Sequence, residues 1–306
     1  MNGSTAARTA RNVPALLLAL RQEGFTGAVT VSGSPGGTLH LERGLVLAID
    51  TPGTPTAETL LLRSGRISEA DWNAALAASA ADGRLDRALI AEGAVGAAEL
   101  EIVCTAAAFD GAFAMALSGP GGWQVAESAT PPQLALRPGL EPQRLFDETA
   151  HRRSLLTAFW GPPGELARTR FQPAVGVGGG YADRMPRRYQ QLLAAATGRN
   201  TPRDMGFALG RGLFAVMLDL ARLDARRLLH AEPARPADAA PSVAPRTPPT
   251  GPPADPPTAA TGPLPRRTPG QHTPGGPVTP GGPVTPGGPT APDEPPIALS
   301  TEKSQP

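Results

Sequence analysis

The side chains that most often carry catalysis or hold metal ions are few and scattered in this chain of 306 residues. Cys104 is the only cysteine, so the chain can form neither an intrachain disulfide nor a thiolate metal cluster. No two histidines have the spacing of a metal-ligand pair: they are His40, His151, His230 and His272. We therefore expect no metal site, no cofactor and no catalytic residue, which predicts a protein that is not an enzyme.

Phosphate-binding loops are not predicted either. A P-loop requires a lysine, and the only lysine, Lys303, lies far beyond the segments predicted to fold. The glycines of residues 176–180 partly imitate a dinucleotide-binding loop, but they lack the glycine at the sixth position, which favours a linker. Glu141, Asp147 and Glu148 are more typical of a solvated helix face than of a catalytic carboxylate pair.

Opposite charges gather in different parts of the chain, although the formal net charge is only +1. Residues 1–130 contain 8 Arg and 13 acids, a net charge of −5, whereas residues 181–230 contain 9 Arg and 4 Asp, a net charge of +5. A basic segment of this kind is typical of a protein that meets an acidic partner. Ordinary scatter of charge is the alternative interpretation.

Hydrophobic periodicity predicts an α+β region at residues 12–128. Asn12 is placed to cap a helix that begins at Val13 or Pro14. An antiparallel three-stranded meander is expected from three short segments: 27–32, 38–42 and 45–50. Helical patterns follow at 54–62, 68–81, 85–92 and 95–110. Residues 111–117 and 123–125 are predicted to form a strand pair around a glycine turn.

The rest of the chain divides into three parts. Residues 129–183 are interpreted as a connecting helix and a glycine-rich linker. Residues 184–230 contain three helical patterns, at 187–197, from Thr201 onward and at 213–223. Residues 231–306 hold 23 Pro and 9 Gly in 76 positions and no aromatic residue. They cannot bury enough apolar surface to offset chain entropy, so we predict a disordered Pro/Gly-rich tail.

Residues 16–125 resemble the PATAN-like domain, a small module often fused to bacterial signalling and gliding proteins. The residues that carry the resemblance are Phe25-Thr-Gly27, the run from Gly37 to Gly44, and Leu60-Leu-Leu-Arg-Ser-Gly65. Such domains are thought to mediate protein–protein contacts. The resemblance therefore implies that residues 12–128 form an interaction domain and not a catalyst.

Residues 186–229 resemble a winged helix-turn-helix of the type in actinobacterial operons that encode small Ras-like GTPases, roadblock proteins and sensor kinases. The residues that carry this resemblance are the run from Thr201 to Gly210, Leu213, Val216 and Leu220. The resemblance implies a mainly helical, winged-helix-like domain at 184–230, with its last helix as the recognition helix. The expected fold class is α+β: a small antiparallel sheet with helices, this helical domain, and the tail.

The last helix of this region offers two kinds of binding face. Four arginines near it are candidate contacts to DNA phosphates: Arg199, Arg203, Arg211 and Arg222. The outward positions of the helix are mostly apolar, and Phe214 and Leu218 form the candidate partner-binding face. Asp219 lies close to these positions, and we expect it to repel phosphates.

These residue patterns leave two functions open. The first is a transcriptional regulator that binds DNA, and the alternative is a protein–protein adaptor in small-GTPase/roadblock or sensor-kinase signalling. The partner is therefore DNA or a signalling protein. For the apolar face, a homodimer contact is a further option, and with a different helix register the same face would be part of the core. No apolar run approaches the about 20 residues that a membrane span needs, so we expect a cytoplasmic protein without a membrane partner.

Overall fold

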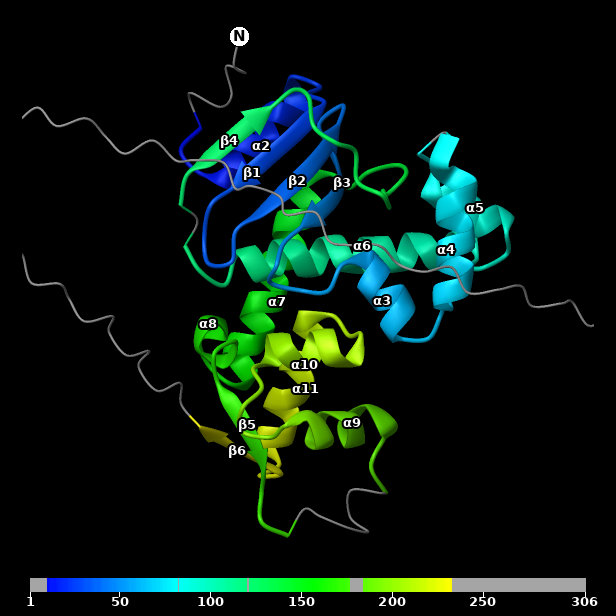
Figure 1. The fold of residues 1–306 in the computed structure, drawn as a ribbon. Coiled ribbons are helices and arrows are strands. Elements are labelled where there is room, and N and C mark those ends of the chain that lie inside the picture. The colour runs from blue at the N-terminus through cyan, green and yellow to red at the C-terminus, as the bar shows by residue number, and fades with distance from the viewer. Residues whose placement is uncertain (1–9, 82, 120, 177–183, 233–306) are drawn as a thin grey trace, which may run out of the picture. The chain divides into compact units, whose positions relative to one another are not determined.

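The computed structural model describes residues 10–81, 83–119, 121–176 and 184–232, and their elements form an α+β fold (Figure 1). Residues 177–183 and 233–306, which the sequence assigns to a linker and a disordered tail, lie outside the described residues. Within the described ranges, two clusters of buried hydrophobic side chains organise the chain.

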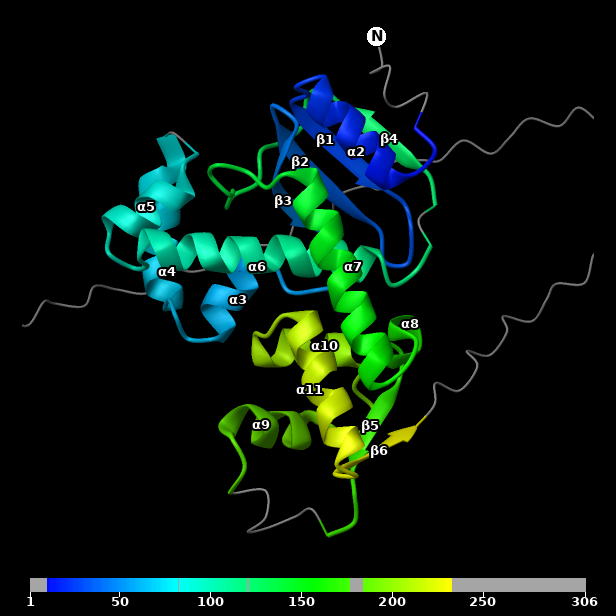
Figure 2. The ribbon, with the colours of Figure 1, turned by 180° about the vertical axis from the view of Figure 1, so that it is seen from behind.

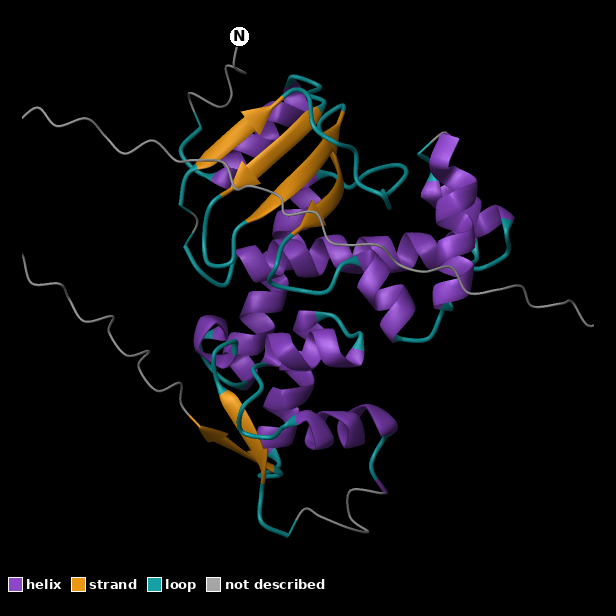
Figure 3. Ribbon diagram, in the orientation of Figure 1, coloured by secondary structure: helices purple, strands orange, loops and turns teal. Residues whose placement is uncertain are grey.

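A four-stranded antiparallel sheet stands at the centre of the first cluster in the described chain (Figure 3). Its spatial order is β3 (Leu45–Asp50), β2 (Gly37–Glu42), β1 (Gly27–Val31) and β4 (Trp123–Ala126). The predicted three-stranded meander is thus confirmed. Strand β4 pairs with the other edge of β1, with Val125 opposite Val29.

Alternation along the strands gives this sheet one apolar and one polar face. Val29 and Leu39 are buried opposite one another on the apolar face, whereas Thr30 and Thr38 pair on the polar face. Helix α2 (Val13–Gln22) and the beginning of α7 (Pro142–Phe159) cover the apolar face, as the two opposite views show (Figures 1 and 2). Helices therefore cover the apolar face of the sheet and shield it from water.

The predicted helix starts are set by side-chain caps. Asn12 Oδ1 accepts a hydrogen bond from the Ala15 N–H at 2.8 Å at the start of α2. Thr56 and Ser68 cap the next two helices in the same way. The remaining helices of this part are α3 (Ala57–Arg63), α4 (Glu69–Ala78), the 3-10 turn η1 (Ser79–Ala81), α5 (Leu85–Ala91) and α6 (Ala97–Met115).

Helix α6 is longer than the sequence predicts, and the expected strand over 111–117 is wrong. A Cβ atom at Gly111 would lie 2.8 Å from Ile49 Cγ2, so the glycine allows α6 to pack closely on β3. Phe113 and Ala114 are completely buried. Residues 107–114 of α6 are almost all buried, so this half of the helix carries no single apolar stripe, and its sequence imitates a buried strand.

The proline-rich connection of residues 130–140 covers the outer edge of β3. Leu136 N–H donates to Leu47 O at 2.9 Å, and Leu140 exchanges hydrogen bonds of 2.8 and 2.9 Å with Val46. The covered backbone groups of β3 cannot pair with another chain. The first cluster continues through these residues to Leu145, so the boundary expected after residue 128 runs through continuous packing.

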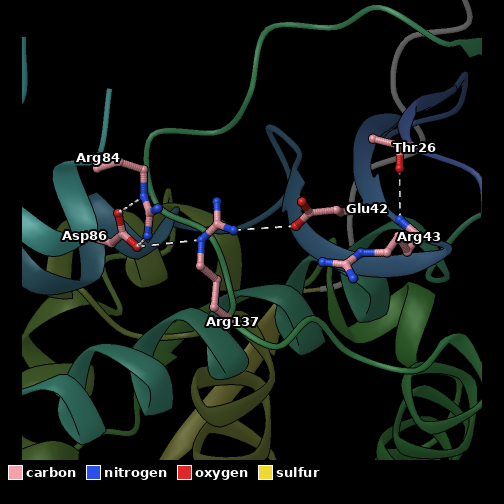
Figure 4. Close-up of polar contacts among 6 residues, drawn as sticks. All are labelled: Thr26, Glu42, Arg43, Arg84, Asp86 and Arg137. Atoms are coloured by element: carbon pink, nitrogen blue, oxygen red, sulfur yellow. Dashed lines mark hydrogen bonds and ion pairs between the residues drawn. The ribbon is translucent and has the colours of Figure 1, made fainter. Parts of the chain in front are cut away.

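Arg137 ties this connection to two other elements (Figure 4). Its guanidinium lies 3.5 Å from Glu42 Oε2 on β2 and 3.7 Å from Asp86 Oδ2 on α5. Arg84 Nη2 also pairs with Asp86 at 2.9 Å, and these arginines lower the pKa of the Asp86 carboxyl, chiefly through the hydrogen bond from Arg84. The contacts are partly exposed, so each adds little to stability.

The second cluster is built from α7, α8 (Pro163–Leu166), β5 (Arg170–Pro173), α9 (Arg187–Ala195), α10 (Pro202–Leu209), α11 (Leu213–Ala225) and β6 (Leu229–Glu232). Strands β5 and β6 pair antiparallel, so residues 170–173 are a strand. Thr201 and Asp204 form a capping box at the start of α10. Phe113 and Leu156 are buried members of this cluster, which therefore begins in α6 and α7, well before residue 184.

Asp110 of α6 is the polar contact where the two clusters meet. Its Oδ1 accepts hydrogen bonds from Arg152 of α7 at 2.9 Å and from the Phe214 N–H of α11 at 3.1 Å. Helix α11 begins after Gly212, which has no side chain to cap it, so Asp110 supplies the cap from another helix. Burial raises the pKa of the Asp110 carboxyl, and Arg152 and the Phe214 amide oppose that shift.

We expect Gly212→Ala to lower the free energy of unfolding by about 2–3 kcal/mol. A Cβ atom at Gly212 would overlap Asp110 Oδ2, so the carboxylate would have to leave its position at the start of α11. Urea unfolding followed by circular dichroism measures the change.

Gly96→Ala is the matched control for this variant. Gly96 precedes α6 with φ −72° and ψ 146°, close to the −58° and 143° of Gly212. A Cβ atom at Gly96 meets nothing within 4 Å, so this variant is expected to cost at most about 1 kcal/mol. Equal losses for the two variants would contradict the assigned role of Asp110.

Candidate functional site

Helix α11, which the resemblance makes the recognition helix, is the central helix of the second cluster. It contacts α6, α7, α9, α10 and β6. Its buried residues are Leu213, Val216, Met217, Asp219, Leu220, Ala221 and Leu223. A helix covered on this many sides cannot enter a DNA groove without first unpacking from its neighbours.

The two residues of the candidate partner-binding face contact other residues of the chain. The Phe214 ring meets Phe113 edge-on with ring centroids 5.6 Å apart, and the Arg152 guanidinium lies 4.8 Å from the Phe214 ring. Leu218 is half-buried and packs against the same cluster. Phe214 therefore packs against α6 and α7 on a side that periodicity within one helix makes outward, and both side chains are only partly exposed.

Asp219 brings two of the four candidate phosphate contacts together. Arg211 Nη2 lies 2.6 Å from Asp219 Oδ2, and Arg222 Nη1 lies 3.4 Å from Asp219 Oδ1. Arg188 of α9, which the sequence did not single out, approaches the same carboxylate at 3.7 Å. The Asp219 side chain is only 6% exposed. Its charge is therefore offset by the arginines that it positions, which weakens the expected repulsion of phosphates.

The other two candidate phosphate contacts have different surroundings. Arg203 is exposed on α10 and lies 5.7 Å from the Phe207 ring. Arg199 is exposed in the preceding loop, and its carbonyl accepts a hydrogen bond from Arg170 Nε at 3.0 Å. Among the described residues, no ion pair joins either arginine to Asp219. The four arginines therefore do not form one cluster through direct contacts.

A tyrosine extends the cluster around Asp219. The Arg188 guanidinium lies 4.7 Å and the Arg226 guanidinium 6.0 Å from the Tyr189 ring. Such cation–π contacts hold arginines in place without neutralising their charge. We call Arg188, Arg211, Arg222 and Arg226 the arginine cluster.

A different kind of site lies between α6 and α7, where a groove has a volume of about 760 Å³. Ile102 of α6 stands in this groove with 68% of its surface exposed. Ala98, Ala106 and Phe109 continue the apolar strip along α6. Sequence reasoning missed Ile102, and the signal that could have revealed it is an isoleucine outside the inward face of its helix.

The rim of this groove carries more negative than positive charge. Glu101 of α6 and Asp147 of α7 are exposed, and neither joins an ion pair among the residues that the structure describes. Glu148, Arg144 and Arg152 also line the groove. Arg152 is already paired with Glu148 at 2.7 Å, so little of its charge is left for a partner.

A third candidate site is a cavity of about 360 Å³ that is lined by His40, Asp50 and Cys104, among others. His40 Nε2 lies 2.8 Å from Asp50 Oδ2. Burial raises the pKa of the Cys104 thiol to about 11, so the thiol stays protonated near neutral pH and is not an activated nucleophile. In the described part of the chain, no three His, Cys, Asp or Glu residues are arranged to hold a metal ion.

Comparisons of this chain with protein-family models, with curated proteins and with solved structures found no match. Within the described ranges, no helix combines the length and the apolar character that crossing a membrane requires. The groove and the arginine cluster are two candidate binding surfaces.

We expect Phe214→Ala to lower the free energy of unfolding by about 2–4 kcal/mol, because it removes the ring packed between Phe113 and Arg152. The neighbouring Ala215 is exposed, so Ala215→Ser is a control that should change stability by less than about 0.5 kcal/mol. Urea unfolding measures both. A Phe214→Ala variant as stable as the parent would mean that this face of α11 is free.

Proposed function

We propose that the protein is a non-enzymatic bacterial regulator that acts as an adaptor and binds another protein in the groove between α6 and α7. The observation that carries this proposal is Ile102, a large apolar side chain that is 68% exposed in a groove with an acidic rim. Burying such a side chain contributes about 1.5–3 kcal/mol to binding. Apolar surface with a polar rim is typical of protein-binding sites.

The partner that fits this groove is an amphipathic helix with Lys or Arg beside its apolar side. The strip of Ala98, Ile102 and Phe109 follows α6 at nearly helical spacing, so a second helix can lie along it. Glu101 and Asp147 flank the strip and favour a basic partner over an acidic one.

The resemblance to PATAN-like domains supports the same proposal, because those domains are thought to mediate protein contacts. Small GTPases, roadblock proteins and sensor kinases are the partners that the second resemblance implies, and they are the first proteins to test. A second copy of this chain is the homodimer alternative, and sedimentation at several concentrations distinguishes it from a different partner.

Ile102→Glu is expected to weaken binding of the groove partner by at least about tenfold, because it places a carboxylate in the apolar strip of an acidic groove. The measurement is titration of the full chain with purified GTPase, roadblock and kinase candidates. Ile90→Glu is the control, since Ile90 of α5 is 40% exposed and lies outside the groove. Undiminished binding by Ile102→Glu would contradict the proposal.

A second candidate function is transcriptional regulation through contacts with the DNA backbone, and the arginine cluster is its support. Arg188, Arg211 and Arg222 lie within 2.6–3.7 Å of the single carboxylate of Asp219, so the positive charge there exceeds the negative charge. Guanidinium groups held in this way fit phosphate oxygens. Because α11 is packed into the second cluster, we propose contacts that are independent of base sequence.

Arg188→Gln combined with Arg222→Gln is expected to reduce the slope of log binding constant against log salt concentration by about 2. This is the change that the loss of two phosphate contacts produces. Fluorescence anisotropy of a labelled duplex at several salt concentrations measures the slope. The control is Arg66→Gln combined with Arg87→Gln, which removes two exposed arginines outside the arginine cluster. If no duplex binds the full chain even at low salt, this second function is excluded.

A further inference from the structure

An apolar pocket of about 450 Å³ opens on the side of α7 that faces α2. The buried side chains of Leu17 of α2, Val31 of β1 and Leu39 of β2 line it, together with Met115 and Phe146. This volume is in the range of small-molecule sites, which are mostly apolar with a few polar groups that fix orientation. Walls of this kind gain dispersion contacts from an apolar occupant.

Three polar side chains line the pocket, and two of them are already engaged. The Ser118 hydroxyl donates to Ser34 O at 2.7 Å, and the Thr149 hydroxyl donates to Leu145 O at 2.7 Å. The third polar side chain is Arg153 of α7. It is exposed, and no partner for its guanidinium is found among the described residues.

The charge of Arg153 is not neutralised by the acids of its own helix. Asp147 and Glu148 line the groove between α6 and α7, not the pocket, and Glu148 pairs with Arg152. The pocket therefore combines an apolar interior with one guanidinium. A guanidinium presents donors in a planar fork that matches the two oxygens of a carboxylate.

We propose that this pocket binds an aliphatic monocarboxylate, a free medium-chain fatty acid being the simplest member of that class. The hydrocarbon chain lies on Leu17, Val31 and Leu39, and the carboxylate pairs with Arg153. This site is separate from the protein-binding groove, and the proposal does not depend on the adaptor function.

The test is titration of the full chain with decanoate, followed through the methyl carbon of methionine by NMR. Met115 lines the pocket, whereas Met205 and Met217 are completely buried in the second cluster. We expect decanoate to shift the Met115 signal and to leave the other two unchanged. Decanol has the same kind of hydrocarbon chain without the charge, so it should bind more weakly than decanoate.

Two variants separate the contribution of the guanidinium from that of the apolar walls. Arg153→Gln is expected to weaken decanoate binding by about tenfold and to leave decanol binding unchanged. Ala150→Trp places a ring at the pocket and is expected to abolish binding of both compounds. Ala158→Trp is the control, because Ala158 is an exposed residue of the same helix that does not line the pocket.

Several results would overturn this proposal. They include a Met115 signal that does not respond to decanoate, equal decanoate binding by the parent and Arg153→Gln, and an equal effect of the two tryptophan variants. Deletion of residues 2–9 is a further check. If that deletion alone shifts the Met115 signal and decanoate does not, the chain's own N-terminal segment occupies the pocket.

Discussion

The buried carboxylate of Asp110 is the interaction on which the arrangement of the two clusters depends. A charge at this depth requires a full set of partners, and they come from two other helices, as Arg152 of α7 and the Phe214 amide of α11. Removing one partner of a buried ion pair costs about 3–5 kcal/mol, since the other is left without compensation. The same contact fixes which side of α11 meets α6 and α7, and thereby which surfaces remain for a partner.

Arg152 contacts both the buried Asp110 carboxylate and the surface groove between α6 and α7. Its side chain is 12% exposed, pairs with Asp110 and Glu148, and lies 5.5 Å from the Phe109 ring and 4.8 Å from the Phe214 ring. It also lines the groove that we propose as the protein-binding site. That groove is therefore formed by two helices fixed by buried contacts and not by a loop. Binding to a rigid surface costs less conformational entropy than binding to a surface that becomes ordered only in the complex.

Interactions between neighbours in the sequence were predictable, and contacts between distant segments were not. The caps at Asn12 and Thr201 and the alternation over residues 27–50 depend on residues a few positions apart, so they identify helix starts and strands without tertiary information. Which side of α11 is buried could not be predicted without knowing which segments pack on it. Periodicity defines Phe214 as outward with respect to one helix, and the segment that packs on it lies in α6. The surroundings of Asp219 could not be predicted for the same reason, because α9 brings Arg188 to it from elsewhere in the chain.

Helix α7 is a wall of both proposed sites, and its periodicity keeps them apart. Phe146, Thr149 and Arg153 line the pocket, whereas Asp147, Glu148 and His151 line the groove. Residues three or four apart lie on one side of a helix, so a substitution on one side leaves the chemistry of the other site intact. The helix is buried at Leu145 in the first cluster and at Leu156 in the second. Between these two buried points the Arg152–Asp110 pair ties α7 to α6, so both proposed sites share a wall that is held in place by buried contacts.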